Sequence, residues 1–134
     1  MPILKLANTV LGPMTLGAGE ATDVEDCIAT DLTKATSLTL CLIAQYDTDA
    51  TNGIAVTAYP SFDGITWDTQ PWVVSGNTWG WKPVHDSGDN TGYVVVHCDQ
   101  LPTTPKYIRF VLDNQDDNKA VTGVQLIVVK QEAG

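Results

Sequence analysis

The residues best suited to chemistry in this chain are two groups of acidic side chains in turn-like segments. Asp47 and Asp49 precede an Asn-Gly dipeptide in the order D-x-D-x-x-N-G, and Asp113 and Asp116 lie in the segment DNQDDNK. Hard cations such as Ca²⁺ bind several oxygen ligands that a short loop presents together. Neither group follows the twelve-residue EF-hand pattern. We therefore expect solvated turn residues, with a calcium site at these four aspartates as the alternative.

The tryptophans are a second group, because aromatic side chains can bind sugars and protein partners. All four fall in one part of the chain, together with a tyrosine and a phenylalanine: Tyr59, Phe62, Trp67, Trp72, Trp79 and Trp81. If Trp79 and Trp81 share a strand, they also share a face of it. We expect these rings to serve as core or as contact with a protein partner, Trp79 and Trp81 in particular. A sugar-stacking platform, as in a carbohydrate-binding module or a receptor-binding domain, is the alternative.

Catalytic signatures are missing from the sequence. Nucleophilic catalysis needs a Ser, Cys or Thr with a base in reach, and the histidines are His85, in a loop, and His97, in a strand pattern. No G-x-S-x-G elbow accompanies them. Asp63 and Asp68 flank a turn, where Asp63 has a sufficient structural role. We expect a protein that is not an enzyme, with no catalytic residue and no cofactor.

The cysteines favour buried, reduced thiols. Cys27, Cys41 and Cys98 are widely spaced, odd in number and without a C-x-x-C pair. A disulfide framework or a zinc site needs paired or closer spacing. Inside apolar strand patterns a cysteine behaves as a small hydrophobic residue.

Composition and charge narrow the classes of partner. The chain has 134 residues, a single-domain length, and carries a net charge of −9 from 7 basic and 16 acidic residues. No basic cluster is visible, so we expect neither nucleic acid nor an anionic membrane as partner. No apolar run approaches the roughly 18 residues that span a bilayer. The N-terminus lacks the features of a secretory signal, which predicts assembly in the cytosol.

The clearest local pattern is a hairpin over residues 54–72. Ile54, Val56 and Ala58 alternate with polar or small residues, as in a half-buried strand. Asp63-Gly64 suits the two central positions of a type I′ turn. The return leg would then carry Trp67, which we expect to fill the core, and Trp72.

The remaining strand-like runs predict an all-β fold. Residues 37–46, 93–98, 107–112 and 121–130 alternate or are apolar throughout, and turn residues separate them. No segment shows helical periodicity over ten residues. About eight strands without crossover elements predict an antiparallel β-sandwich or jelly roll.

The domain organisation is one β-sandwich domain over residues 25–134, preceded by an N-terminal arm or edge strand over residues 1–24. Gly-Pro and Gly-Ala-Gly segments interrupt the apolar residues of the arm. An extended arm of this kind orders against a neighbour. Its apolar side chains are therefore expected partner contacts: Ile3, Leu4, Leu6, Leu11 and Met14.

Two motifs are similar to those of small β-sandwich proteins in tailed-phage virions. One is S-x-DG-x-T-W at residues 61–67, and the other is Y-[IV]-R-[FV] at residues 107–110. The likeness covers roughly residues 28–130. It implies a structural virion component, such as a head-decoration (cement) protein on the major capsid protein or a tail accessory protein. It also implies a homo-oligomer, with a trimer favoured, and no catalytic residues.

Overall fold

The computed structural model describes residues 3–47, 49, 52–67, 70–74, 77–81, 94–101, 103 and 105–133, and within this part it is all-β. A single turn of 3-10 helix, η1 (Val24–Asp26), follows the first strand. The strands are β1 (Ile3–Leu16), β2 (Thr30–Asp31), β3 (Ala35–Tyr46), β4 (Ile54–Ser61), β5 (Val73–Val74), β6 (Asn77–Thr78), β7 (Gly80–Trp81), β8 (Val94–Leu101), β9 (Tyr107–Asn114) and β10 (Val121–Ala133).

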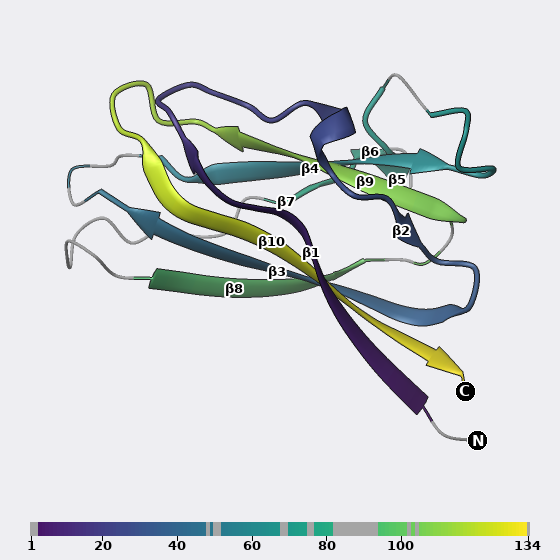
Figure 1. The fold of residues 1–134 in the computed structure, drawn as a ribbon. Coiled ribbons are helices and arrows are strands. Elements are labelled where there is room, and N and C mark those ends of the chain that lie inside the picture. Colours follow the sequence, from purple (N-terminus) through teal and green to yellow (C-terminus); the bar gives the residue numbers. More distant parts are fainter. Residues whose placement is uncertain are drawn as a thin grey trace.

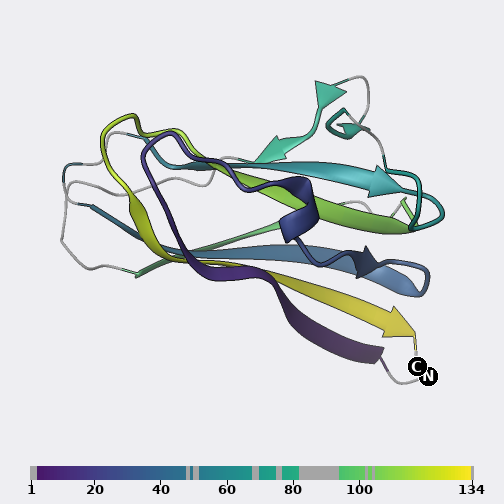
Figure 2. The same ribbon diagram turned by 45° about the horizontal axis from the view of Figure 1, so that its top comes forward.

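Two antiparallel sheets form two layers (Figures 1 and 2). One sheet has the order β1-β10-β3-β8, the other has the order β2-β9-β4-β7, and β5 pairs with β6 in a separate ribbon. The expectation of an antiparallel all-β protein is confirmed. Within the described residues the two sheets hold eight strands, but two of these, β2 and β7, are two-residue segments, so only six strands are eight residues or longer.

The core lies between the sheets and follows the sequence alternation. In β3 the side chains of Leu38, Leu40 and Leu42 are buried, and the intervening ones are half-buried. β4 and β9 contribute Val56 and Phe110 in the same way. Each large apolar side chain fully buried there contributes about 1.5–3 kcal/mol relative to an exposed one. The facing apolar stripes therefore hold the two sheets together.

The predicted hairpin over residues 54–72 is wrong. β4 pairs with β9 and with the short β7. The described residues of the predicted return leg form no strand beside it, although the Trp72 N–H donates to the Ala58 carbonyl at 2.8 Å. After Ser61 the chain bends over residues 62–66 instead of starting a return strand. Side chains within this segment bind its own backbone, which removes the donors that a strand ladder would need.

The N-terminal segment is an edge strand. β1 pairs with β10 from Ile3–Ala133 to Leu16–Val121, so the two chain ends lie side by side (Figures 1 and 2). Its register shifts around Gly12, whose φ of +86° favours glycine. Beyond this point Leu16 is buried, and just before it so are Val10 and Leu11.

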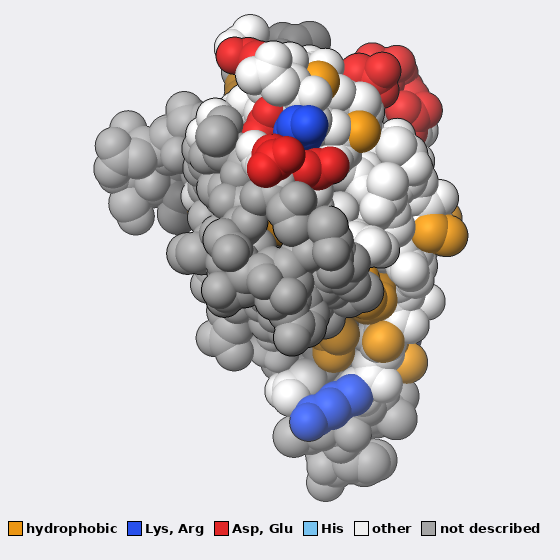
Figure 3. Space-filling view, turned by 90° about the vertical axis from the view of Figure 1, so that its left-hand side faces the viewer, with side chains coloured by type: hydrophobic (Ala, Val, Ile, Leu, Met, Phe, Trp, Pro, Cys, Tyr) orange, Lys and Arg blue, Asp and Glu red, His pale blue; other side chains and the backbone are white. Residues whose placement is uncertain are grey.

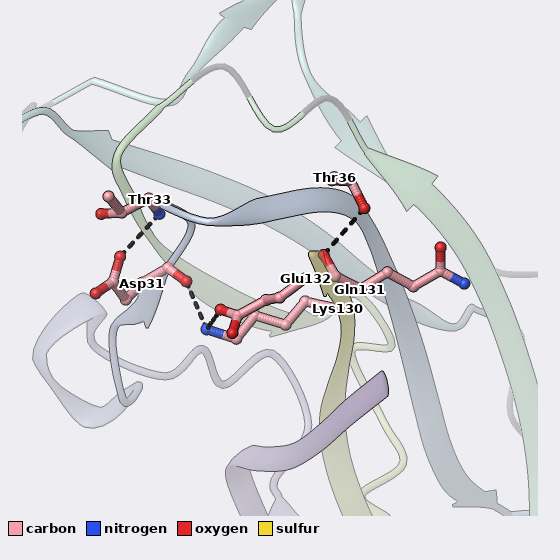
Figure 4. Close-up of polar contacts among 6 residues, drawn as sticks. All are labelled: Asp31, Thr33, Thr36, Lys130, Gln131 and Glu132. Atoms are coloured by element: carbon pink, nitrogen blue, oxygen red, sulfur yellow. Dashed lines mark hydrogen bonds and ion pairs between the residues drawn. The ribbon is translucent and has the colours of Figure 1, made fainter. Parts of the chain in front are cut away.

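A lysine links the two layers at their open side (Figure 4). Lys130 on β10 donates from Nζ to the backbone oxygen of Asp31 on β2, at 2.6 Å, and forms an ion pair with Glu132 at 3.0 Å. The Thr33 side chain, together with the Thr33 N–H that donates to the Asp31 carboxylate, holds the pKa of Asp31 below its usual value. Polar contacts thus join β2 to β10 where the core ends.

Candidate functional site

A depression of about 460 Å³ lies on the outer face of the β2-β9-β4-β7 sheet, and we call it the Arg109 depression. Its lining combines aromatic, charged and hydroxyl side chains: Thr22, Asp23, Val24, Glu25, Tyr59, Trp67, Arg109 and Val111. Small-molecule sites combine such surfaces with a few convergent polar groups in volumes of about 300–1,000 Å³.

The floor of the depression comes from two paired strands. Tyr59 on β4 is the direct cross-strand neighbour of Arg109 on β9, and Val111 lies two residues further along β9 on the same face. Alternation places Ile108, Phe110 and Leu112 in the core and these residues outside it. Directly opposed side chains on one face lie within about 5.5 Å at Cβ, so Tyr59 and Arg109 form one surface.

One wall is built by a strand that is interrupted. Residues 20–31 run along β9, but only Thr30 and Asp31 pair with it as β2. Ala21 forms an isolated bridge with Asp113, and the Thr22 N–H donates to the Leu112 carbonyl at 2.9 Å. Between Thr22 and Thr30, β9 bonds instead to side chains. The N–H of Phe110 donates to Cys27 Sγ at 3.3 Å, and that of Leu112 donates to Thr22 Oγ1 at 3.0 Å.

These two side chains take the place of backbone partners for β9. The backbone between them forms η1, which lies against β9 (Figure 1). The Asp26 carboxylate accepts the N–H of Asp23 at 3.1 Å and closes this turn. Asp23 and Glu25 are exposed, and both line the depression. The wall is therefore acidic.

The opposite side is Trp67, whose ring lies under the Arg109 guanidinium with Cζ 3.9 Å from the ring centroid. Arginine stacks on aromatic faces in this way. Within the described residues, Arg109 Nε is buried and has no hydrogen-bond partner. The prediction that Trp67 fills the core is wrong. The ring is half-buried on the outside of the sheet and stacks against Arg109 instead.

A compact turn over residues 61–66, the Ser61 turn, positions Trp67. Ser61 Oγ accepts the N–H of Gly64 at 2.9 Å and donates to the Thr66 carbonyl at 2.6 Å. The Asp63 carboxylate accepts the N–H groups of Ile65 and Thr66 at 2.8 and 2.7 Å. These two backbone bonds lower the pKa of Asp63 to about 2. The S-x-DG-x-T-W motif therefore makes a side-chain-bonded turn, not a type I′ hairpin.

Two side chains near the depression that could act as nucleophiles have structural roles. Ser61 Oγ is engaged inside its turn. Cys27 is buried behind the wall, as expected for a structural thiol, and burial raises its pKa to about 11. A thiol with such a pKa remains protonated at neutral pH and is a poor nucleophile. Cys41 is half-buried on β3.

The β1 residues predicted as partner contacts differ in how exposed their side chains are. Leu6 is 37% exposed and Met14 is half-buried against the core. Leu11 is only 3% exposed, so its prediction as a contact is wrong: it packs in the core beside the bulge at Gly12. The side chains of Ile3 and Leu4 lie outside the described part.

Trp79 follows the expectation of core packing, and the alternative of a sugar platform with Trp81 stays a prediction. Trp79 is half-buried and packs on the core, with its ring 6.3 Å from that of Phe110 in an edge-to-face arrangement. It lies between β6 and β7, so it shares no strand with Trp81, whose side chain lies outside the described part. His85 and the side chain of His97 also lie outside it.

The acidic segments predicted as calcium ligands have another role, centred on Asp116. Asp116 is 1% exposed, and its carboxylate accepts the N–H groups of Asn118 and Lys119 at 2.9 Å and of Asn52 at 3.2 Å. The expectation of a solvated turn residue is therefore wrong for Asp116, because backbone donors surround it. The described residues hold no group of three or more His, Cys, Asp or Glu side chains placed for a metal ion.

Asn114 completes this arrangement, which we call the Asn114 cluster (Asn114 and Asp116 with their backbone partners). Asn114 is fully buried, its Oδ1 accepts the N–H of Asp116, and its Nδ2 donates to the carbonyls of Leu16, Gly17 and Lys119. Around it, the end of the molecule carries exposed acids, which gather in the upper part of the face in Figure 3. Asp47 there accepts the N–H of Asp49.

Sequence reasoning missed the Arg109 depression. Arg109 is the sole arginine of the chain and sits at an outward position of an alternating strand, which was the available signal. No comparable signal pointed to the acidic wall, because η1 depends on side-chain contacts with β9.

The fold and surface define an all-β protein of two antiparallel sheets with a polar, aromatic depression on one of them. No family model matches the chain, and a comparison with curated proteins finds no match. Among solved structures, dimeric latent PorU from Porphyromonas gingivalis is similar, with 12% sequence identity and a TM-score of 0.41. The match covers 97% of this chain and 13% of the PorU chain, and a likeness this weak carries no argument. The described part contains no helix long and apolar enough to cross a membrane.

Proposed function

We propose that this chain is a non-enzymatic structural protein of a tailed-phage virion, a decoration protein that binds the major capsid protein lattice. The sequence motifs at residues 61–67 and 107–110 support it, and so does the strand order. Counted one to eight, the sheet strands β1, β2, β3, β4, β7, β8, β9 and β10 have the orders 1-8-3-6 and 2-7-4-5. This order favours a jelly-roll sandwich, an architecture common in viral capsid proteins.

The observation that carries the proposal is the outer edge of β1. β1 has one neighbour in its sheet, β10, and the five side chains of residues 5–9 are exposed on both faces of the strand. A long open edge presents unpaired backbone N–H and C=O groups that can pair with a strand of another chain. We propose that this edge binds a neighbouring virion protein, and that copies associate as a homo-oligomer, with a trimer favoured.

The test is co-sedimentation with capsid shells assembled from the major capsid protein of the same genome. Residues 2–8 are deleted, because a longer deletion would remove Val10 and Leu11 from the core. We expect the shortened chain to stay folded and to lose binding to the shells, because its pairing edge is gone. Phe62→Ser is the control, since Phe62 is 71% exposed on a loop far from β1 in sequence, and it should bind like the unchanged protein.

Equal binding of the shortened and intact chains would refute the role of the edge. Failure of the intact chain to bind the shells at all would refute the decoration function itself. Circular dichroism and Tm measurements on both variants confirm that each is folded.

A further inference from the structure

We infer that the Arg109 depression binds a neutral saccharide, at a site separate from the β1 edge. Three features of the depression support this inference: an unpaired donor, an acidic wall and aromatic surfaces. All of them belong to one face of the β2-β9-β4-β7 sheet.

The donor is the Arg109 guanidinium. The Trp67 ring stacks against it, and its buried Nε has no hydrogen-bond partner within the described residues. Guanidinium groups have five N–H donors, and an unpaired donor away from water costs free energy. A ligand oxygen that reaches the stacked guanidinium would remove that cost.

The acceptors are the carboxylates of Asp23 and Glu25 on the η1 wall of the same depression. This pairing of opposite charges discriminates between ligands. A phosphate or carboxylate bound to Arg109 would face two negative groups, and a cation bound to the wall would face the guanidinium. A neutral ligand with hydroxyl groups can accept from Arg109 and donate to the carboxylates at the same time.

The aromatic surfaces select a ligand with both hydroxyls and C–H faces. Tyr59 and Trp67 line the depression together with Arg109, and Val111 adds an apolar patch. Such amphipathic rings accept the C–H face of a sugar and leave its hydroxyls to polar neighbours. The volume of about 460 Å³ suits one or two sugar rings.

The test is an NMR titration of the intact protein with neutral sugars: glucose, galactose, mannose, N-acetylglucosamine and cellobiose. Because Arg109 is the sole arginine, its Nε–H signal identifies itself. We expect at least one neutral sugar to shift this signal and the indole N–H of Trp67. Glucuronic acid and glucosamine, which keep the glucose ring but add a charge, should bind more weakly than the neutral sugar.

The variants are Trp67→Ala and Arg109→Lys, the second of which keeps the charge and loses the planar fork. Each should weaken binding of the responsive sugar by about tenfold or more. Ile65→Ala is the matched control, because Ile65 is 86% exposed in the same loop and does not line the depression. It should bind like the unchanged protein.

No shift of the Arg109 signal with any neutral sugar would overturn the inference. Tighter binding of glucuronic acid than of every neutral sugar would also overturn it, in favour of an anion site. If Arg109→Lys does not fold, the titration of the unchanged protein still decides, because it depends on no variant. Loss of shell binding by the β1 deletion leaves this result unaffected.

Discussion

The Ser61 turn and the Asn114 cluster are built in the same way, but only the cluster joins segments that are far apart in the sequence. In both, a carboxylate accepts backbone N–H groups: Asp63 binds two within its own turn, and Asp116 binds three. One of the three belongs to Asn52, on a different loop. Asp63 is exposed, whereas Asp116 is 1% exposed and touches the fully buried Asn114.

The difference separates local from global roles. The Ser61 turn orders the residues just before Trp67. The Asn114 cluster joins the end of β1, the segment before β4 and the loop before β10, so its loss would loosen several elements together. Experiments on Asn114, Asp116 and Asp63 test this contrast.

The largest effect is expected for Asn114→Asp. The new carboxylate would replace a donor that now binds the carbonyls of Leu16, Gly17 and Lys119, and it would be buried against them. An uncompensated buried charge costs about 3–5 kcal/mol. Urea unfolding at pH 7 should show a loss of this size. Folding should recover in part at low pH, because protonation restores a neutral donor, and an unchanged midpoint at pH 7 would contradict the role of Asn114.

A smaller loss is expected for Asp116→Ala. Removing the carboxylate leaves three backbone N–H groups of the described residues without their acceptor, and a hydrogen bond to a charged group contributes about 1.5–3 kcal/mol. Asn118 is exposed and Asn52 and Lys119 are half-buried, so water can replace the carboxylate in part, and we expect a loss of about 3 kcal/mol in urea unfolding. Asp116→Asn keeps one acceptor oxygen and should fall between this variant and the unchanged protein. A cost no greater than that of Asp63→Ala would abolish the contrast between the two loops.

The smallest effect is the acid dependence of the Ser61 turn. Asp63 has a pKa of about 2, below its ordinary value of 3.8, so its contribution is present above pH 4 and is lost as pH falls toward 2. Asp63→Asn keeps an acceptor oxygen but does not titrate there. The Tm difference between the two proteins should therefore shrink between pH 5 and pH 2. A constant difference would show that the carboxylate charge does not support the turn.

The long strands were predictable from the sequence because each carries an alternation that one buried face requires. Residues 37–46 and 107–112 illustrate this, with Leu40 and Phe110 on the inner faces as expected. The hairpin failed because Ser61 and Asp63 form bonds with nearby backbone that the Asp-Gly signal does not encode. A turn dipeptide indicates only which φ values its residues tolerate. The neighbouring side chains decide whether a return strand forms after it.

The sites were less predictable because they depend on partners distant in the sequence. The acidic residues near Asp116 looked equivalent, and only the contact with Asn52 distinguishes the buried one. In the same way, Trp67 looked like a core residue until β9 placed Arg109 over its ring. Leu11 looked like part of an arm, because no pattern in residues 1–16 predicts that they pair with β10.

The pairing of Ile3 with Ala133 brings the two ends of the chain together on adjacent strands. Domains with neighbouring termini accept circular permutation and insertion into other proteins. A short linker between these ends could therefore close the chain into a ring. The same geometry would let the whole domain be displayed from a surface loop of a carrier protein, with both attachment points on one side and the Arg109 depression left uncovered by the join.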